Sequence, residues 1–296
     1  MIDISIIIVN YRTSNLTIEC VESIEQVLKD ETIKYEIIIV DNHSEDGEID
    51  RLKKLEKKNI KVLETAYNGG FGYGNNYGVS KANGRYLFFL NSDTILYPTI
   101  LCEMYKNIVN NVDVGIISCL MEDGDGTPLV VAHSFENVKS LFIQTIVKPL
   151  VPEFIKKYRG KRNHKSYTGK IAECDWVSGA AMLMPKELFL NVGGWNEKFF
   201  MYMEDEELCY RVKKIGYKVK IYPKIGVKHF VGKSGGTPFV AYEKYKSAKI
   251  YFDLMQQKMN KFINVLIYIQ AWNYMKGIQW SQRKDVIKKL KEFKNE

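Results

Sequence analysis

The tripeptide Asn91-Ser92-Asp93 has the residue types and the spacing to hold a metal ion. It follows the apolar run at residues 85–90, which predicts a buried strand. Asn91 and Asp93 are two residues apart, so their oxygens face the same side of an extended chain. Amide and carboxylate oxygens are ligands for hard divalent cations. The segment is also a common turn sequence, and it indicates a site for a cation or a cation-bound diphosphate only together with other residues.

Two further segments could supply chemistry. Glu204 and Asp205 open a predicted helix, where the helix dipole stabilises acids whatever their role. In a functional role, one of them would accept a proton from a substrate hydroxyl. His229 follows a predicted strand, and a neutral imidazole near Asp93 would make a third metal ligand, although a lone histidine is equally compatible with a structural role.

The glycine-rich segment at residues 68–74, predicted as a loop, does not fit the common phosphate-binding fingerprints. A dinucleotide fingerprint would require a glycine where Asn75 or Tyr77 stands. There is also no glycine-rich loop ending in Gly-Lys-Ser or Gly-Lys-Thr. These observations argue against a dinucleotide-binding protein and a P-loop nucleotidase.

Apolar runs alternate with helical patterns through the first third of the chain. Strands are predicted at residues 4–9, 36–40, 60–63 and 85–90, with helices at 14–28, 49–58 and 75–81. This alternation is typical of a doubly wound α/β fold with a mostly parallel sheet, in which ligands bind at the carboxyl ends of the strands. Polar residues follow three of these strands, namely Asn10 and Tyr11, Asp41 and Asn42, and Asn91 and Asp93.

The composition is that of a globular protein. The 296 residues are 46% hydrophobic and 26% charged, with a net charge of +8, which excludes collagen-like, disulfide-scaffold and disordered classes. The five cysteines are scattered and form no Cys-x-x-Cys pair, which favours buried thiols in a reducing, cytoplasmic compartment. No apolar stretch is long enough for a membrane-spanning helix, and the N-terminal run is too short for a signal peptide.

The ordered set of motifs resembles the family 2 glycosyltransferases with the GT-A fold, in particular their rhamnosyltransferase-like branch of bacterial surface polysaccharide synthesis. The resemblance covers residues 4–235. The matching segments are Ile8-Val9-Asn10-Tyr11, Asp41-Asn42-His43-Ser44, Asn68-Gly69-Gly70-Phe71-Gly72-Tyr73-Gly74-Asn75-Asn76, Leu90-Asn91-Ser92-Asp93-Thr94, Val177-Ser178-Gly179-Ala180-Ala181, Gly193-Gly194-Trp195-Asn196-Glu197, Glu204-Asp205-Glu206-Glu207-Leu208-Cys209 and Val227-Lys228-His229.

The resemblance implies a role for each matching position. Asp205 would be the catalytic base and Glu204 would help to hold the acceptor. Asp41 would hydrogen-bond the nucleobase, and Asp93, with Asn91 and His229, would bind Mg²⁺ or Mn²⁺. The residues implied in binding the donor are Asn10, Tyr11, Asp41, Asn68, Gly70, Phe71, Asn75, Asn91, Ser92 and Asp93. Asn91 stands where the family has an aspartate, so this site has one anion fewer.

The implied reaction is an inverting, metal-dependent transfer of a sugar from a nucleoside diphosphate to a hydroxyl of a lipid-linked glycan. The branch points to dTDP-rhamnose as donor, and UDP-hexoses and UDP-N-acetylhexosamines remain open. Other readings are an inactive sugar- or nucleotide-binding module, a nucleotidyltransferase, and a nucleic-acid-binding protein suggested by the basic charge. The last finds no support, because the chain has no nucleic-acid motif and the predicted site is acidic.

We expect a catalytic domain over residues 1–238, with a nucleotide-sugar half at 1–118 and an acceptor half at 119–238, followed by a helical extension at 239–296. A basic stretch at residues 156–170 and an apolar segment at 262–272, followed by basic residues at 283–294, allow three readings. The tail would pack on the catalytic domain, attach peripherally to the anionic inner face of the cell membrane, or form a homodimer contact.

Overall fold

The computed structural model describes residues 1–45, 47–147, 150, 169–230, 238–255, 261–275 and 287–288. The chain divides into two compact units. The sheet unit comprises Met1–Phe135, Gly160–Glu197 and Glu204–Val231, and the helical unit comprises Glu136–Arg159, Lys198–Met203 and Gly232–Glu296. The helical unit therefore takes in the predicted extension and two segments from the middle of the chain.

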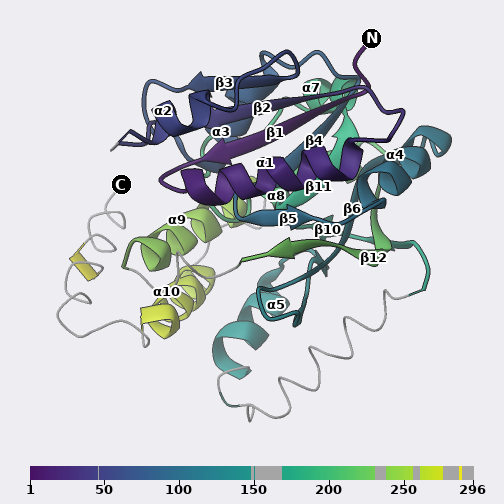
Figure 1. The fold of residues 1–296 in the computed structure, drawn as a ribbon. Coiled ribbons are helices and arrows are strands. Elements are labelled where there is room, and N and C mark those ends of the chain that lie inside the picture. The colour runs from purple at the N-terminus through teal and green to yellow at the C-terminus, as the bar shows by residue number, and fades with distance from the viewer. Residues whose placement is uncertain are drawn as a thin grey trace. The chain divides into compact units, whose positions relative to one another are not determined.

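The sheet unit is a mixed α/β structure with a mostly parallel core of strands (Figure 1). Its strands lie in the order β3-β2-β1-β4-β11-β6-β12-β5, with β7 beside β6 and β9 beside β12, while β8 and β10 form a separate pair. Its elements are β1 (Ile4–Asn10), α1 (Ser14–Leu28), β2 (Tyr35–Asp41), α2 (Glu48–Lys53), β3 (Ile60–Glu64), α3 (Gly70–Val79), β4 (Tyr86–Asn91), β5 (Thr94–Leu96), α4 (Ile100–Asn110), β6 (Val114–Glu122), β7 (Pro128–Leu129), β8 (Ala132–His133), β9 (Ala172–Cys174), β10 (Trp176–Val177), β11 (Ala181–Pro185), α7 (Lys186–Asn191), α8 (Glu204–Lys214) and β12 (Lys218–His229).

The predicted parallel strands are confirmed, and their register aligns the polar residues at their ends. β1 is parallel to both β2 and β4, and its apolar residues are buried because helices cover both faces of the sheet. Asn10 pairs with Asp41, and Val9 pairs with Asn91. The side chains that follow the three strands therefore reach the same edge of the sheet.

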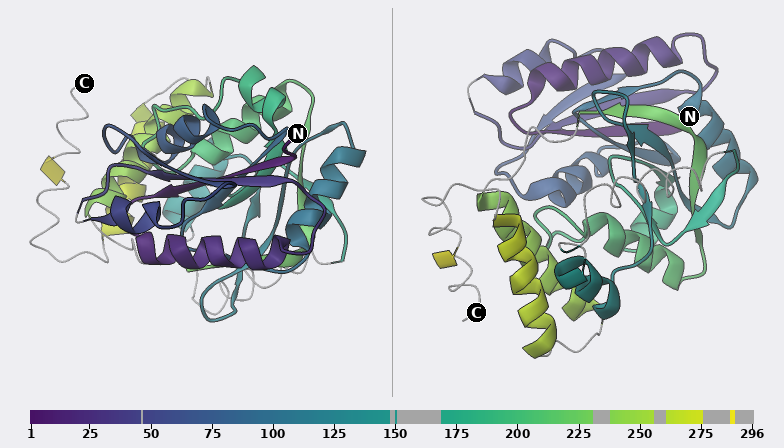
Figure 2. Two further views of the ribbon diagram at one scale, coloured as in Figure 1. Left: turned by 45° about the horizontal axis from the view of Figure 1, so that its top comes forward. Right: turned by 90° about the horizontal axis from the view of Figure 1, so that it is seen from below.

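Helices α1 and α3 lie on opposite faces of the sheet (Figure 2). The prediction of a loop at residues 68–74 and a helix from residue 75 was wrong, because α3 already begins at Gly70. A Cβ atom at Gly74 would lie 2.8 Å from Val9, and one at Gly78 would lie 2.7 Å from Ile7. These glycines let the helix approach β1 closely, and this packing outweighs their poor helix propensity.

Strand β12 is longer than the short strand predicted at residues 218–222. It runs from Lys218 to His229 and follows β6 through register shifts between Tyr222 and Val227. Its last residues pair antiparallel with β5, so that His229 stands opposite Thr94. The bulged strand thereby delivers His229 to the segment that follows β4.

The helical unit contains α5 (Val138–Phe142), the π-helix η1 (Ile143–Val147), α9 (Pro238–Leu254) and α10 (Lys261–Met275). Its core is formed by buried residues from these elements and from the segment before α8, including Leu141, Phe199, Tyr251, Phe252 and Leu266. Most of the predicted basic stretch at 156–170 and of the basic tail at 283–294 lies outside the described residues.

All five cysteines are free and buried, as the sequence predicts. Within the ranges that the structure describes, no helix has the length and apolar character needed to cross a membrane.

Candidate active site

The three predicted metal ligands come together at the end of β4. The Nε2 atom of His229 lies 3.1 Å from Oδ1 of Asp93 and 3.3 Å from Nδ2 of Asn91. One ring nitrogen cannot donate to the carboxylate and also accept from the amide. Rotating the Asn91 amide by half a turn, which ordinary structures do not distinguish, turns its oxygen toward the same nitrogen and removes the conflict.

With that rotation, the donor set at this point fits a divalent cation. It offers a carboxylate oxygen from Asp93, an amide oxygen from Asn91 and an imidazole nitrogen from His229, and all three side chains are at least partly shielded from solvent. Oxygen ligands suit Mg²⁺ and Mn²⁺, and imidazole is also a ligand for transition metals such as Mn²⁺. No cluster of three His, Cys, Asp or Glu side chains occurs among the described residues, because the third donor here is an asparagine.

Asn10 and Asp41 form a buried network at the ends of β1 and β2. The Asn10 amide donates to Oδ1 of Asp41 at 2.7 Å, and the backbone N–H of Ser44 donates to Oδ2 at 2.9 Å. Thr13 and Thr17 donate to the Asn10 amide oxygen. Both Asn10 and Asp41 are fully buried, so in this arrangement the Asp41 carboxylate holds the loop after β2 in place.

The same network reaches the predicted cation site. The hydroxyl of Thr13 lies 3.1 Å from that of Ser92, the middle residue of the tripeptide. Tyr11 is 41% exposed, and the guanidinium of Arg12 stacks over its ring at 5.2 Å. The exposed aromatic ring is the part of the predicted nucleobase pocket that is free to contact a ligand.

The segment before α3 is fixed by amide side chains. The Nδ2 atom of Asn42 donates to Oδ1 of Asn68 and to the carbonyl of Gly70, both at 2.9 Å. The Asn68 oxygen also accepts from the backbone N–H of Gly70 at 3.1 Å. Asn75 donates to the carbonyl of Phe71, one helical turn earlier. These contacts set the path of the chain where the resemblance places the nucleoside and the sugar.

The turn at Ser178–Ala180 connects the catalytic acids to the cation site. The backbone N–H of Gly179 donates to Oδ2 of Asp205 at 3.1 Å. The carbonyl of the next residue, Ala180, accepts from the backbone N–H of Asn91 at 2.9 Å. Asp205 and Asn91 therefore lie on either side of one dipeptide, so the predicted base and the predicted metal ligands belong to one site.

Two aromatic residues pack against this turn. A Cβ atom at Gly179 would lie 3.3 Å from both Phe71 and Trp195. The two rings contact each other edge to face, with centroids 5.2 Å apart. Phe71 was predicted as a site residue, whereas the positioning roles of Gly179 and Trp195 were not, although both lie in motifs that the sequence displays.

Burial shifts the proton affinity of both acids at the start of α8. It raises the pKa of Asp205 above its usual range, and hydrogen bonds from the Gly179 and Glu206 backbones partly offset this effect. Burial, together with the charge of Asp205, raises the pKa of Glu204 well above its usual range. The Oε2 atom of Glu204 is buried and makes no hydrogen bond to the described part of the chain. Folding therefore favours the protonated form of Glu204.

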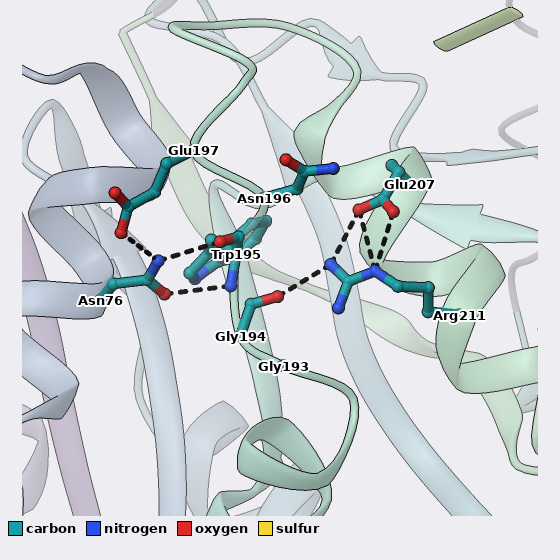
Figure 3. A pocket seen from close by; sticks show the side chains of 8 residues that line it. All are labelled: Asn76, Gly193, Gly194, Trp195, Asn196, Glu197, Glu207 and Arg211. Atoms are coloured by element: carbon teal, nitrogen blue, oxygen red, sulfur yellow. Dashed lines mark hydrogen bonds and ion pairs between the residues drawn. The ribbon is translucent and has the colours of Figure 1, made fainter. Parts of the chain in front are cut away.

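A hollow of about 450 Å³ lies beside the segment that contains Trp195 (Figure 3). Asn76 holds this segment by accepting from the N–H of Trp195 at 3.0 Å and donating to its carbonyl at 2.9 Å. On the other side, Arg211 forms a bidentate ion pair with Glu207 and donates to the carbonyl of Gly194 at 2.8 Å. The segment is thus fixed at both ends, and the Trp195 ring is held against Gly179.

The mostly parallel sheet with this cluster at its edge has the GT-A architecture. The sequence profile described as Glycosyl transferase family 2 matches residues 5–174, more than half of the chain, and this protein belongs to that family. Residues 163–232 match the profile described as N-terminal domain of galactosyltransferase.

Relatives agree with this assignment. The chain is 26% identical over 216 residues to the low-salt glycan biosynthesis hexosyltransferase Agl10 of Haloferax volcanii, a match that covers 72% of this chain and 62% of Agl10. It is 24% identical to the N-acetylglucosaminyl-diphospho-decaprenol L-rhamnosyltransferase of Mycobacterium tuberculosis over 68% of each chain. These matches span about two thirds of each relative.

A solved structure shares the fold. The mannosyltransferase PcManGT from Pyrobaculum calidifontis, solved in complex with GDP-Man and Mn²⁺, superposes with a TM-score of 0.58 at 14% sequence identity. The superposition covers 91% of this chain and 69% of PcManGT.

Proposed function

We propose that this protein is an inverting, metal-dependent glycosyltransferase that moves a sugar from a nucleoside diphosphate to a hydroxyl of a cell-surface glycan. The observation that carries the proposal is the pair of backbone hydrogen bonds at Gly179 and Ala180, which hold Asp205 beside the cluster at Asn91. A proton acceptor next to a set of cation ligands is what a single displacement at an anomeric carbon requires.

Asp93, Asn91 and His229 would hold Mg²⁺ or Mn²⁺ against the diphosphate of the donor. When bound, the cation would offset the negative charge that develops on the leaving diphosphate. Each carboxylate oxygen of Asp205 accepts one backbone hydrogen bond and keeps capacity for another. Asp205 would take the proton from the acceptor hydroxyl as its oxygen bonds to the anomeric carbon and the bond to the phosphate oxygen breaks on the opposite face. The raised pKa makes Asp205 a stronger base for this step.

The rhamnosyltransferase relatives favour dTDP-rhamnose as the donor and a lipid-linked glycan as the acceptor. A UDP-hexose or UDP-N-acetylhexosamine is the second candidate, since poly(ribitol-phosphate) beta-glucosyltransferase is 34% identical over 130 residues, 42% of this chain. Cytoplasmic location agrees with the five free thiols.

The test is nucleotide binding by thermal shift and calorimetry, with dTDP, UDP and GDP, each with and without Mn²⁺. One nucleotide should raise the melting temperature only when Mn²⁺ is present, because a ligand that binds the folded state stabilises it. Asp93→Ala should lower affinity for that nucleotide about tenfold or more, whereas Asp30→Ala, an exposed carboxylate elsewhere in the sheet unit, should not. Equal affinities in the two variants would contradict the cation site. Release of nucleoside diphosphate from the matching sugar donor with Mn²⁺ present distinguishes an active enzyme from an inactive binding module.

A further inference from the structure

Helix α10 is apolar on two opposite sides. Ile263, Leu266, Ile267 and Ala271 are at most 2% exposed and form part of the helical unit's core. Phe262 and Val265, together with Tyr268 and Trp272 further along the helix, are 37–54% exposed. A helix that is apolar all round normally has a nonpolar environment on every side. In the described structure, protein supplies that environment on one side only.

A second element of the same unit extends the exposed surface. Phe142, at the end of α5, is 40% exposed, and Ile143, at the start of η1, is 43% exposed. The Phe142 ring stacks on that of Phe262, with centroids 6.4 Å apart, and Asn273 donates to the carbonyl of Thr145 at 3.1 Å. The two elements lie side by side (Figure 2). We name this surface the apolar face; its members are Phe142, Ile143, Phe262, Val265, Tyr268 and Trp272.

The positive charge of the chain is concentrated in the unit that carries the apolar face. The helical unit has 19 Lys and Arg against 7 Asp and Glu, a net charge of +12. The sheet unit has 24 against 28, a net charge of −4. Exposed lysines begin both elements of the face, Lys139 in α5 and Lys261 in α10. An anionic surface would therefore attract this unit and not the other.

We propose that the apolar face is a docking surface for an anionic lipid bilayer. Its aromatic side chains suit the boundary between headgroups and acyl chains, where Trp and Tyr are enriched, and the surrounding lysines suit the lipid phosphates. Charge argues against a second copy of the chain as the occupant, because two units of net charge +12 repel each other. The proposal does not depend on the glycosyltransferase activity, and its test uses no sugar.

The experiment is co-sedimentation of the full chain with vesicles of phosphatidylcholine alone or mixed with phosphatidylglycerol. The chain should bind the anionic vesicles, and raising the salt from about 0.1 M to about 0.5 M should weaken binding because the charges are screened. The double variant Phe262→Ser/Val265→Ser should lower the partition coefficient about tenfold or more. The control Val112→Ser, an 89% exposed valine of the sheet unit, should bind like the unchanged chain. Circular dichroism and nucleotide affinity show that the variants remain folded.

Three outcomes would overturn the proposal. The first is equal sedimentation with neutral and anionic vesicles. The second is unchanged binding by the double variant. The third is a chain that ignores vesicles but forms a dimer in light scattering that the double variant dissociates, which would assign the apolar face to a contact between copies.

Discussion

The substitution Asp205→Asn separates the proton-accepting role of this carboxylate from its structural role. Its two oxygens accept from the backbone N–H groups of Gly179 at 3.1 Å and Glu206 at 2.9 Å. An asparagine keeps one acceptor and turns its NH₂ group toward the other donor. Losing a hydrogen bond to a charged group costs about 1.5–3 kcal/mol. Part of this cost is offset because the variant no longer buries a charge, so we expect the melting temperature to fall by only a few degrees, about 2–4 °C per kcal/mol.

Turnover should fall much further, by about 10²- to 10⁴-fold, because the variant cannot take the proton of the acceptor hydroxyl. The assay is the initial rate of nucleoside diphosphate release with donor, acceptor and Mn²⁺ at saturation, well below the melting temperature. The dissociation constant of the nucleotide should stay within about threefold of the original value, since the binding groups are intact.

Asp175→Asn is the matched control. Asp175 also accepts a backbone N–H, from Phe135 at 3.2 Å, and pairs with Lys213 at 3.1 Å, but it has no predicted part in the chemistry. It should lose stability and keep its turnover. Turnover of Asp205→Asn within about threefold of the unchanged enzyme would refute the base assignment, and equal losses in the two variants would attribute the effect to folding.

Three further substitutions test the structure around the site. Glu204→Gln should raise the melting temperature, and the gain should grow from about pH 4.5 to about pH 8, because stability that depends on a protonated Glu204 is lost as pH rises through its raised pKa; a constant difference would contradict this. Gly78→Ala should lower the free energy of unfolding in urea by about 1–3 kcal/mol because its Cβ would lie 2.7 Å from Ile7, whereas an exposed helical glycine would gain about 1 kcal/mol. Asn10→Ala should cost about 2–4 kcal/mol in the same measurement because it removes a donor from the buried carboxylate of Asp41; a smaller loss would mean that water replaces the amide.

The sequence predicted the strands and their polar ends because these depend on local patterns. The apolar runs that form β1, β2 and β4 are continuous, and continuous runs of this length are typical of strands covered on both faces. Once those strands are parallel, the register alone brings Asn10, Asp41 and Asn91 to one edge. His229 was identified by motif order, and the structure confirms its proximity to Asp93.

Features that depend on tertiary contacts were not predictable. The start of α3 at Gly70 follows from the close approach of Gly74 to Val9, which no local propensity encodes. The roles of Gly179 and Trp195 arise where segments distant in sequence meet. Likewise, nothing local to residues 136–147 indicates that they pack with the C-terminal helices.

The two hydrogen bonds at Gly179 and Ala180 use main-chain atoms only. Evolution can therefore exchange side chains freely around the cleft, and so alter which sugar or alcohol fits, without changing the separation between the base and the cation ligands. An added or deleted residue in that turn has the opposite consequence, since it would shift both reacting ends at once and leave no nearby substitution able to restore them.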